Sequence, residues 1–300
     1  MIYLDKKFKT SKEPDIQRRR FLKLAGPLGV LLANPAFAFD IFKDMQKTQQ
    51  ILKGAGSIVA SSTDLDYKSE FAIGESLALE GFRRYGLPVK EPGIQKYVNL
   101  VGNAVAASSD RSDIPYYFTI VESPLYNAFA CPGGIIFVTS TLIKSMEDES
   151  ELAGVLAHEV SHVSHKHALQ SIKRAKFFEG VGQITAATMK GEDGKKFQNM
   201  IGDLQGVLFD KGLDKNMEFE ADATALEISY RTGYNPSGLV QVLEMLEGRE
   251  SVSEKKGSWF STHPPLNTRI SKCRPNVARY PDAQALASGK ERFTYYKLRL

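Results

Sequence analysis

The chain contains the sequence His158-Glu159-Val160-Ser161-His162, in which a glutamate directly follows the first of two histidines. On an α-helix, residues four apart share a face, so His158 and His162 would direct two imidazoles at one point. Imidazole nitrogens are common zinc ligands, and a neighbouring glutamate is suited to take a proton from water and deliver it to a leaving amine. The motif predicts a hydrolytic zinc site with Glu159 as the general base.

A catalytic zinc ion usually has three protein ligands, so this motif requires one more. The extended pattern HExxHxxGxxH is excluded, because His165 and Ala168 occupy its glycine and final histidine positions. Glu218 is the strongest candidate, and Asp222 follows it by one helical turn, where it could accept the outer N–H of a ligand histidine. Glu220 is a weaker candidate, because it would face away from Glu218 on a helix.

The other histidines allow several roles. His263 precedes two prolines, which fix the backbone and hold its ring in one direction. It could stabilise the oxyanion of the tetrahedral intermediate, occupy the fourth zinc position and keep the enzyme latent, or cap a loop. Arg269 could face the same site or a buried acid. His165 and His167 are expected to form hydrogen bonds on the flank of the motif helix rather than bind metal.

Two helices must hold the predicted ligands. Asp148 and Glu151 have capping-box spacing, which predicts that the motif helix begins near residue 148, and its apolar side indicates a core helix. A second helix over about 215–231 would carry Glu218 and end at Gly233, a residue that favours helix C-termini.

The remaining elements predict an α+β fold that is mostly helical with a small β-sheet. Apolar periodicity and breaker residues indicate helices over 68–85 and 92–107. Aromatic and β-branched residues indicate strands over 116–121 and 135–139. The segment 177–210 is interpreted as a helical surface hairpin, with a flap over the cleft as the alternative.

The N-terminal segment has the features of an export signal. Residues 18–23, Arg-Arg-Arg-Phe-Leu-Lys, match a twin-arginine motif, and the apolar stretch 24–33 is too short to span a bilayer. Ala-Phe-Ala at 36–38 is a small-x-small cleavage site, so the mature chain is expected to begin at Phe39. An uncleaved membrane anchor is the alternative.

Removal of residues 1–38 would change the charge balance. The whole chain has a net charge of +4, but residues 1–38 hold eight basic and three acidic residues. This leaves 31 of the 39 basic and 32 of the 35 acidic residues, a net charge of about −1 that disfavours a nucleic-acid partner. No linker or repeat divides 39–300, which predicts one catalytic domain. Cys131 and Cys273 are expected to be free buried thiols, with a single bridge as the alternative.

Four stretches of the chain carry a resemblance to a known family. They are 127–130 with 132–134, 158–168, 218–222 and 263–270. On these stretches the chain, over roughly 73–270, resembles the gluzincin metallopeptidase family that contains the type I CAAX prenyl endopeptidase, the membrane protease HtpX and soluble periplasmic proteases of outer-membrane quality control. Asp214-Lys215 departs from the Ser-Arg of many relatives, so the resemblance implies no arginine contact there.

The resemblance implies a zincin-type fold with one Zn²⁺ per chain held by His158, His162 and Glu218. It implies hydrolysis of peptide bonds in unfolded or misassembled envelope proteins, and outer-membrane assembly machinery as a candidate partner. Together with the twin-arginine signal, it predicts a periplasmic location.

The resemblance also suggests where substrate would bind. In related zinc peptidases a substrate segment pairs with the edge of a strand, which recognises backbone rather than sequence. The strand that begins at Ile135 and Ile136 is the expected edge, and Gly133 and Gly134 would let a substrate approach closely. A plain core strand is the alternative.

Two other functions remain open at this point. A chaperone or assembly factor could hold extended clients on an edge strand with little proteolysis, but a pure binder would not need Glu159. A structural zinc site normally has four protein ligands. Only three strong ligands are evident here, an argument that weakens if His263 is a fourth.

Overall fold

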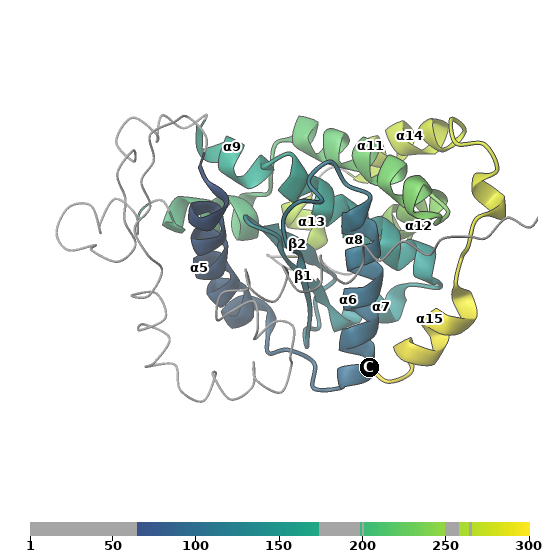
Figure 1. The fold of residues 1–300 in the computed structure, drawn as a ribbon, viewed down its shortest axis with the longest axis horizontal. Coiled ribbons are helices and arrows are strands. Elements are labelled where there is room, and N and C mark those ends of the chain that lie inside the picture. Colours follow the sequence, from purple (N-terminus) through teal and green to yellow (C-terminus); the bar gives the residue numbers. More distant parts are fainter. Residues whose placement is uncertain (1–64, 174–198, 200, 250–257, 264–265) are drawn as a thin grey trace, which may run out of the picture.

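The computed structural model describes residues 65–173, 199, 201–249, 258–263 and 266–300 (Figure 1). The predicted signal peptide and most of the segment 177–210 lie outside the described residues. None of the described helices combines the length and the apolar character that crossing a bilayer requires.

The described residues are mostly helical around a small sheet, as the sequence predicts for an α+β fold. The expected helices and the two expected strands form within a residue or two of their predicted bounds. A third strand, β2, was not expected. The elements are α5 (Tyr67–Tyr85), α6 (Pro92–Ala107), β1 (Tyr117–Val121), β2 (Ala128–Cys131), β3 (Ile135–Thr139), α7 (Ser140–Ser145), α8 (Glu149–Ser164), α9 (His167–Lys173), η2 (Gly206–Lys211), α11 (Lys215–Thr232), α12 (Ser237–Glu247), α13 (Trp259–Thr262), α14 (Leu266–Val277), η4 (Ala283–Ala285) and α15 (Lys290–Lys297).

The sheet has the strand order β1-β3-β2. β1 runs parallel to β3, with Tyr117 opposite Ile135, and β2 runs antiparallel to β3, with Cys131 opposite Ile135. β3 is therefore the central strand, and its five residues are all buried. A continuous apolar run is typical of a strand covered on both faces.

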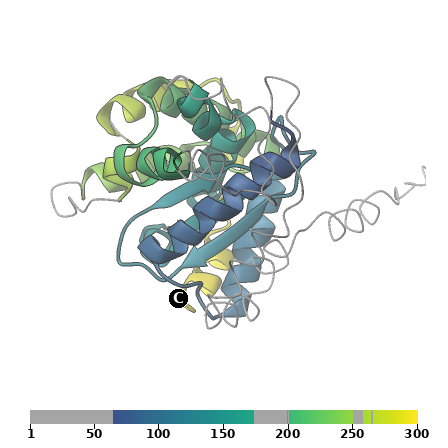
Figure 2. The ribbon, with the colours of Figure 1, turned by 90° about the vertical axis from the view of Figure 1, so that its left-hand side faces the viewer.

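Helices cover both faces of this sheet. Alternate strand residues point to opposite faces, so Phe137 and Phe129 pack on one side with Leu77 of α5, in one apolar cluster. Ile136 and Val138 pack on the other side with residues of α6 and α8, in a second cluster. Figure 2 shows α5 lying across the sheet, with α6 behind it. The helix that carries the His-Glu motif is thus in the centre of the molecule.

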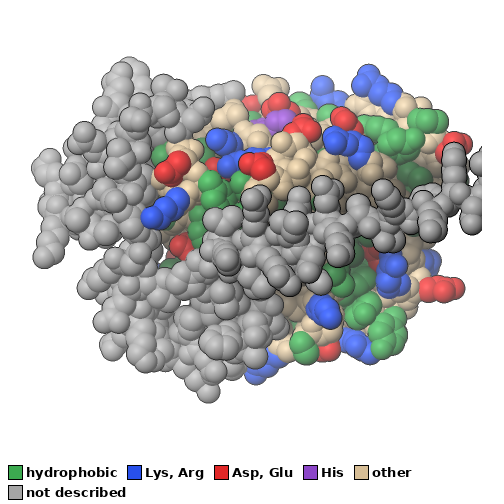
Figure 3. Space-filling model, in the orientation of Figure 1, with side chains coloured by type: hydrophobic (Ala, Val, Ile, Leu, Met, Phe, Trp, Pro, Cys, Tyr) green, Lys and Arg blue, Asp and Glu red, His purple; other side chains and the backbone are tan. Residues whose placement is uncertain are grey.

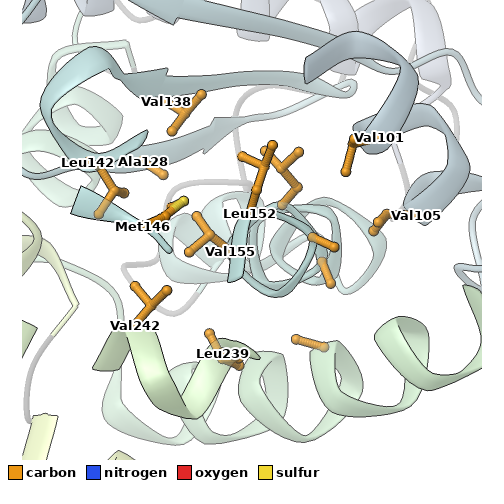
Figure 4. Close-up of a cluster of buried hydrophobic side chains, with 14 of the residues drawn as sticks. Val101, Val105, Ala128, Val138, Leu142, Met146, Leu152, Val155, Leu239 and Val242 are labelled. Atoms are coloured by element: carbon orange, nitrogen blue, oxygen red, sulfur yellow. The ribbon is translucent and has the colours of Figure 1, made fainter. Parts of the chain in front are cut away.

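The larger core lies between the sheet, α8 and α12. Figure 4 shows Val138 and Ala128 on the strands facing Leu152 and Val155 of α8, with Leu239 and Val242 of α12 beyond them. α8 and α12 come very close. A Cβ on Gly154 would lie 2.6 Å from the backbone nitrogen of Leu239, and one on Gly238 would lie 2.2 Å from the carbonyl oxygen of Ser150. Glycine at both positions allows this contact, which holds α8 rigidly.

The N-terminus of α8 is capped as the sequence predicts. Asp148 Oδ1 accepts the backbone N–H of Glu151 at 3.1 Å. The returning carboxylate of Glu151 accepts the N–H of Glu147 at 2.8 Å, one residue earlier than in a standard capping box.

A buried glutamate in the first turn of α8 joins three distant parts of the chain. Glu149 accepts hydrogen bonds from Tyr97 of α6 at 2.5 Å and from Tyr234 at 2.6 Å. Arg292 of α15 forms a bidentate pair with the same carboxylate. The carbonyl of Ser288 also accepts the backbone N–H of Glu149 at 2.9 Å. The first turn of the motif helix is therefore fixed by residues 288–292.

Candidate metal centre

Two adjacent helices supply the predicted metal ligands. α8 carries His158, Glu159 and His162, and α11 packs along it and carries Glu218. All four side chains are nearly or fully buried. Asp214 caps the N-terminus of α11 by accepting the N–H of Asn216 at 2.8 Å, which fixes the first turn, where Glu218 lies.

The donor atoms of these residues converge. The Nε2 atoms of His158 and His162 are 3.0 Å apart. Glu218 Oε2 lies 3.5 Å from His158 Nε2, and its Oε1 lies 3.6 Å from His162 Nε2. A tetrahedral zinc ion with bonds of about 2.0–2.2 Å places neighbouring donor atoms about 3.3–3.5 Å apart. The three predicted ligands therefore fit a single zinc ion.

His263 joins this group as a fourth donor. Its Nδ1 lies 3.0 Å from Glu218 Oε2, and its Nε2 lies 3.3 Å from the carbonyl oxygen of Ala128. When Nε2 donates its hydrogen to that carbonyl, a neutral His263 presents a lone pair to the Glu218 carboxylate. A cation shared by the two groups satisfies both. The ring stacks on Trp259, with centroids 4.4 Å apart, which fixes its direction.

Glu159 is a buried acidic residue beside the candidate metal ligands. It has no measurable exposure, and neither carboxylate oxygen forms a hydrogen bond with any described residue. Its Oε1 lies 3.9 Å from His263 Nε2. Burial raises the pKa of Glu159 above its ordinary value. A carboxyl group in these surroundings is suited to exchange protons at moderate pH.

Asp222 and Arg269 contact the candidate ligands His158 and Glu218. Asp222 Oδ1 lies 3.0 Å from His158 Nδ1, the nitrogen that points away from the metal ligands. Arg269 is fully buried and binds Asp222 through Nε at 2.8 Å and Nη2 at 2.6 Å. Its Nη1 lies 3.2 Å from Glu218 Oε2. The sequence left open whether Arg269 faces the site or a buried acid, and it does both.

These contacts set the ionisation of the ligands in the metal-free protein. Burial alone would raise the pKa of Glu218, but its electrostatic interactions with His263 and with the Arg269 guanidinium hold this pKa well below its ordinary value. Burial and the Arg269 charge would lower the pKa of His158. The carboxylates of Asp222 and Glu218 outweigh both effects and raise this pKa to about 9.

A second group of polar side chains lies beside the first. α8 ends at Ser164 with His165 as its C-cap, and Lys166 has a φ of 53°, so the chain turns sharply before α9 begins at His167. His165 Nε2 lies 2.9 Å from the hydroxyl of Thr224, and His167 Nε2 lies 3.2 Å from Glu220 Oε2. Both histidines form the hydrogen bonds on the helix flank that the sequence predicts.

The expected substrate edge is wrong. β3, which begins with Ile135 and Ile136, pairs with β1 and β2 and has no free edge. Gly133 and Gly134 have φ values of 79° and 95° and form the turn between β2 and β3. A Cβ on Gly133 would lie 2.6 Å from the backbone of Phe71, so the chain itself fills this space.

β2 is the edge strand that borders the metal centre. A cavity beside it is lined by Phe129 and Ala130 of β2, Glu159, His162 and His263, and also by Leu208, Leu213 and Thr262. The sequence did not indicate this strand, because Ala-Phe-Ala-Cys contains no β-branched residue. Its place next to the Gly133-Gly134 turn, which suits a β-hairpin, was the available signal.

Both cysteines are free and buried, as expected. Cys131 ends β2 and Cys273 lies on α14. Residues 206–210, the end of the segment interpreted as a helical surface hairpin with a flap over the cleft as the alternative, lie in the helix η2. Leu208 of η2 lines the cavity at the metal centre, and Phe209 is fully buried.

Comparison with known proteins gives consistent matches over this region. The chain is 27% identical over 283 residues to the beta-barrel assembly-enhancing protease of Yersinia pestis, covering 90% of this chain and 56% of that protein. It is 26% identical over 194 residues to the protein of the same name in Escherichia coli (strain K12), covering 62% of this chain and 39% of that protein.

A mitochondrial relative also matches. The mitochondrial metalloendopeptidase OMA1 of Schizosaccharomyces pombe is 27% identical over 219 residues, which cover 71% of this chain and 61% of that protein. The chain thus spans about half the length of these relatives. The model of peptidase family M48 matches residues 92–276, a region that contains all of the metal-ligand candidates and Glu159. This chain belongs to peptidase family M48.

Proposed function

We propose that this protein is a zinc-dependent metalloendopeptidase in which His158, His162 and Glu218 hold one Zn²⁺. The observation that carries this proposal is the Glu159 carboxylate, which is fully buried beside the converging ligands and has no hydrogen-bond partner among the described residues. Burying such a group without a partner is costly, so it supports a role that is completed only by water and substrate. When bound by these residues, the ion would lower the pKa of a water molecule and polarise the scissile carbonyl.

The residues of the chain perform the proton transfers. Glu159 takes a proton as water attacks the peptide carbonyl and delivers it to the amine that leaves. Asp222 accepts the outer N–H of His158 and thereby fixes its tautomer, while Arg269 holds Asp222 in place. A structural zinc site would need no such base, so the unpartnered Glu159 favours a catalytic site even with His263 as a fourth donor.

We propose that the substrate binds in an extended form along the outer edge of β2. Among the described strands, only β3 pairs with β2. The other edge of β2 faces the cavity that contains Glu159. Strand pairing reads the backbone rather than the side chains, and only an unfolded segment can offer its backbone in this way. This mode of binding suits unfolded or misassembled polypeptides as substrates.

His263 obstructs this route in the present arrangement. Its Nε2 lies 3.3 Å from the carbonyl oxygen of Ala128, a backbone acceptor of the edge strand, and its Nδ1 faces Glu218. A substrate strand needs the same carbonyl and the same side of the metal ion. We therefore favour the latent role for His263, in which substrate must displace the ring before cleavage.

The biological setting is proposed from the relatives and the sequence. Two bacterial relatives are named as proteases that enhance β-barrel assembly. We propose that this protein acts in quality control of envelope proteins, with outer-membrane assembly machinery as a candidate partner. Residues 1–38 would direct twin-arginine export to the periplasm, and residues 39–300 would form a single catalytic domain.

The test compares wild type with Glu159→Gln, using casein cleavage and zinc content on the same preparations. Glutamine keeps the shape of the side chain but cannot take up a proton. We expect zinc content to be unchanged and cleavage to fall by about 10²–10⁴-fold, the usual contribution of a general base. Equal cleavage by both proteins would exclude the proposed mechanism. If zinc-loaded wild type and His263→Ala both cleave nothing, the chaperone alternative is favoured.

A further inference from the structure

The three side chains His165, His167 and Glu220, called here the outer cluster, have the composition of a metal site. Each offers a donor atom within 4.8 Å of the others. His167 Nε2 lies 3.2 Å from Glu220 Oε2, and His165 Nδ1 lies 3.7 Å from Glu220 Oε1. These distances resemble the 3.5 and 3.6 Å between the histidines and Glu218 of the metal centre. Two imidazoles and a carboxylate suit zinc and similar ions.

The backbone holds the two histidines of the outer cluster together. The positive φ of Lys166 reverses the chain between them, and their rings stack with centroids 5.2 Å apart and planes tilted by 16°. The Nδ1 atom of His165 stays directed at Glu220 because its Nε2 is engaged by Thr224. The donor atoms are therefore arranged before any ion arrives, which lowers the entropic cost of binding.

The outer cluster is open to ions from solution. The side chain of Glu220 is 56% exposed and that of His165 is 27% exposed, whereas that of His167 is buried. On the face drawn in Figure 3, histidine reaches the surface at one spot with acidic side chains beside it. A cation can approach from this side, and water can complete its coordination.

The outer cluster contacts the metal centre through one pair of atoms. His162 Nδ1 and His167 Nδ1 are 2.9 Å apart, so one of them donates a hydrogen and the other accepts it. A neutral imidazole carries one ring hydrogen. With an ion on Nε2 of His162, its hydrogen is on Nδ1 and is donated to His167. The hydrogen of His167 is then on Nε2 and is donated to Glu220.

A second ion disturbs this arrangement. An ion on Nε2 of His167 would move the hydrogen of that ring to Nδ1, where it would meet the N–H of His162. The second ion can bind only if one ring loses its proton to the solvent or if the contact between the rings opens. Either change costs free energy, so each ion weakens the binding of the other.

We propose that the outer cluster is a second, weaker site for Zn²⁺ or a similar divalent transition-metal ion, coupled negatively to the metal centre through the contact between His162 and His167. Metal binding by the outer cluster does not depend on the proposed function, whereas the coupling rests on the zinc ion that the proposed function places on His162. Because coupling is reciprocal, an ion in the outer cluster weakens the binding of the ion on His162.

The test measures zinc bound to the full chain at buffered free Zn²⁺ concentrations. Wild type should take up zinc in two steps. His165→Asn and Glu220→Gln should each keep the first step and lose the second. Glu227→Gln is the matched control, since it removes one exposed acid from the same helix, and it should keep both steps.

The coupling has its own measurement. His162→Ala removes both the inner ligand and the opposing N–H, so the outer cluster should bind zinc roughly ten- to a hundredfold more tightly than the second step in wild type. Adding Glu220→Gln to this variant should abolish that binding. An unchanged affinity in His162→Ala would refute the coupling.

Failure of this inference can be told apart from failure of the proposed function. A second step that persists in both His165→Asn and Glu220→Gln would overturn the outer cluster, as would a wild type that binds only one ion up to millimolar free zinc. Either variant is sufficient if the other does not fold. Absence of the first, tight step in wild type would instead contradict the metal centre itself.

Discussion

The metal centre and the outer cluster are built from the same types of ligand but in different surroundings. Each has two histidines from the α8–α9 region and a glutamate from α11, and Glu218 and Glu220 are only two residues apart. Glu218 is fully buried and contacts Arg269, whereas the side chain of Glu220 is 56% exposed. The metal centre also contains a buried acid, Glu159, whose carboxylate has no hydrogen-bond partner among the described residues, and the outer cluster contains no such group. The two proposed sites therefore share their types of donor and differ in burial and in the presence of this acid.

The largest expected effect separates the two glutamates. Glu218→Gln should abolish tight zinc binding and cleavage, because it removes a buried ligand at the centre of four donors. Glu220→Gln, the same change two residues later, should lower cleavage at one equivalent of zinc by no more than about tenfold, as expected for an outer partner. Zinc content and casein cleavage measure both. Similar losses in the two variants would remove the distinction between the two sites.

The next effect concerns the support behind the ligands. Asp222→Asn should weaken zinc binding or lower cleavage by about 10–100-fold, because His158 loses the carboxylate that fixes its tautomer and Arg269 loses its bidentate partner. Thr224→Val is the corresponding change at the outer cluster and should leave the first zinc step intact. Competition with a chelator gives both affinities. A normal first step in Asp222→Asn would show that Asp222 does not support the metal centre.

The first zinc step should also depend on pH. The pKa of His158 in the metal-free protein is raised to about 9, so this ring is protonated below that pH and must lose a proton to bind metal. The zinc affinity of the metal centre should therefore rise between about pH 6 and pH 9, by up to about tenfold per pH unit. Calorimetry in buffers with different ionisation enthalpies should detect protons released on binding. A zinc affinity that falls over this pH range would contradict the prediction.

The smallest expected effect is a gain. His263→Ala should raise cleavage several-fold at one equivalent of zinc, since it frees the carbonyl of Ala128 and one side of the metal ion. His167→Ala offers a comparison on the other flank, where no substrate path is proposed, and it should not raise cleavage. Initial rates on casein measure both variants. A large loss of activity in His263→Ala would support the oxyanion role instead.

Local sequence signals predicted the helices and the pair of helices at the site. Asp148, the motif spacing and Gly233 are all read within one or two helical turns, and the structure places the corresponding boundaries within a residue or two of the prediction. The shared face of His158 and His162 also followed from spacing, and these features depend on helix geometry, which is the same in every fold. Glu218 was instead selected as the glutamate of a later helix with Asp222 one turn beyond it, and its approach to the two histidines is a contact between two helices.

The features that failed depend on contacts between distant segments. Ile135–Thr139 is apolar on both faces, which identifies a buried strand but not which of its neighbours pairs with it. The edge position belongs to Ala128–Cys131, and only the assembled sheet reveals it. The contact of His263 with Glu218 spans 45 residues, and the direction of the His263 ring is fixed by its stacking on Trp259. Sequence could list the possible roles of His263 but could not choose among them.

The hydrogen bonds and the ion pair at Glu149 link the order in which the chain is synthesised to the maturation of the metal centre. Its partner Arg292 lies 143 residues later in the chain, so a ribosome completes the zinc-binding helices long before it makes this partner. Until then the first turn of α8 has a buried carboxylate without its counter-charge, and the α8 backbone lacks the carbonyl of Ser288. The first turn of the motif helix therefore receives its last anchors only after the other residues of the metal centre have been synthesised.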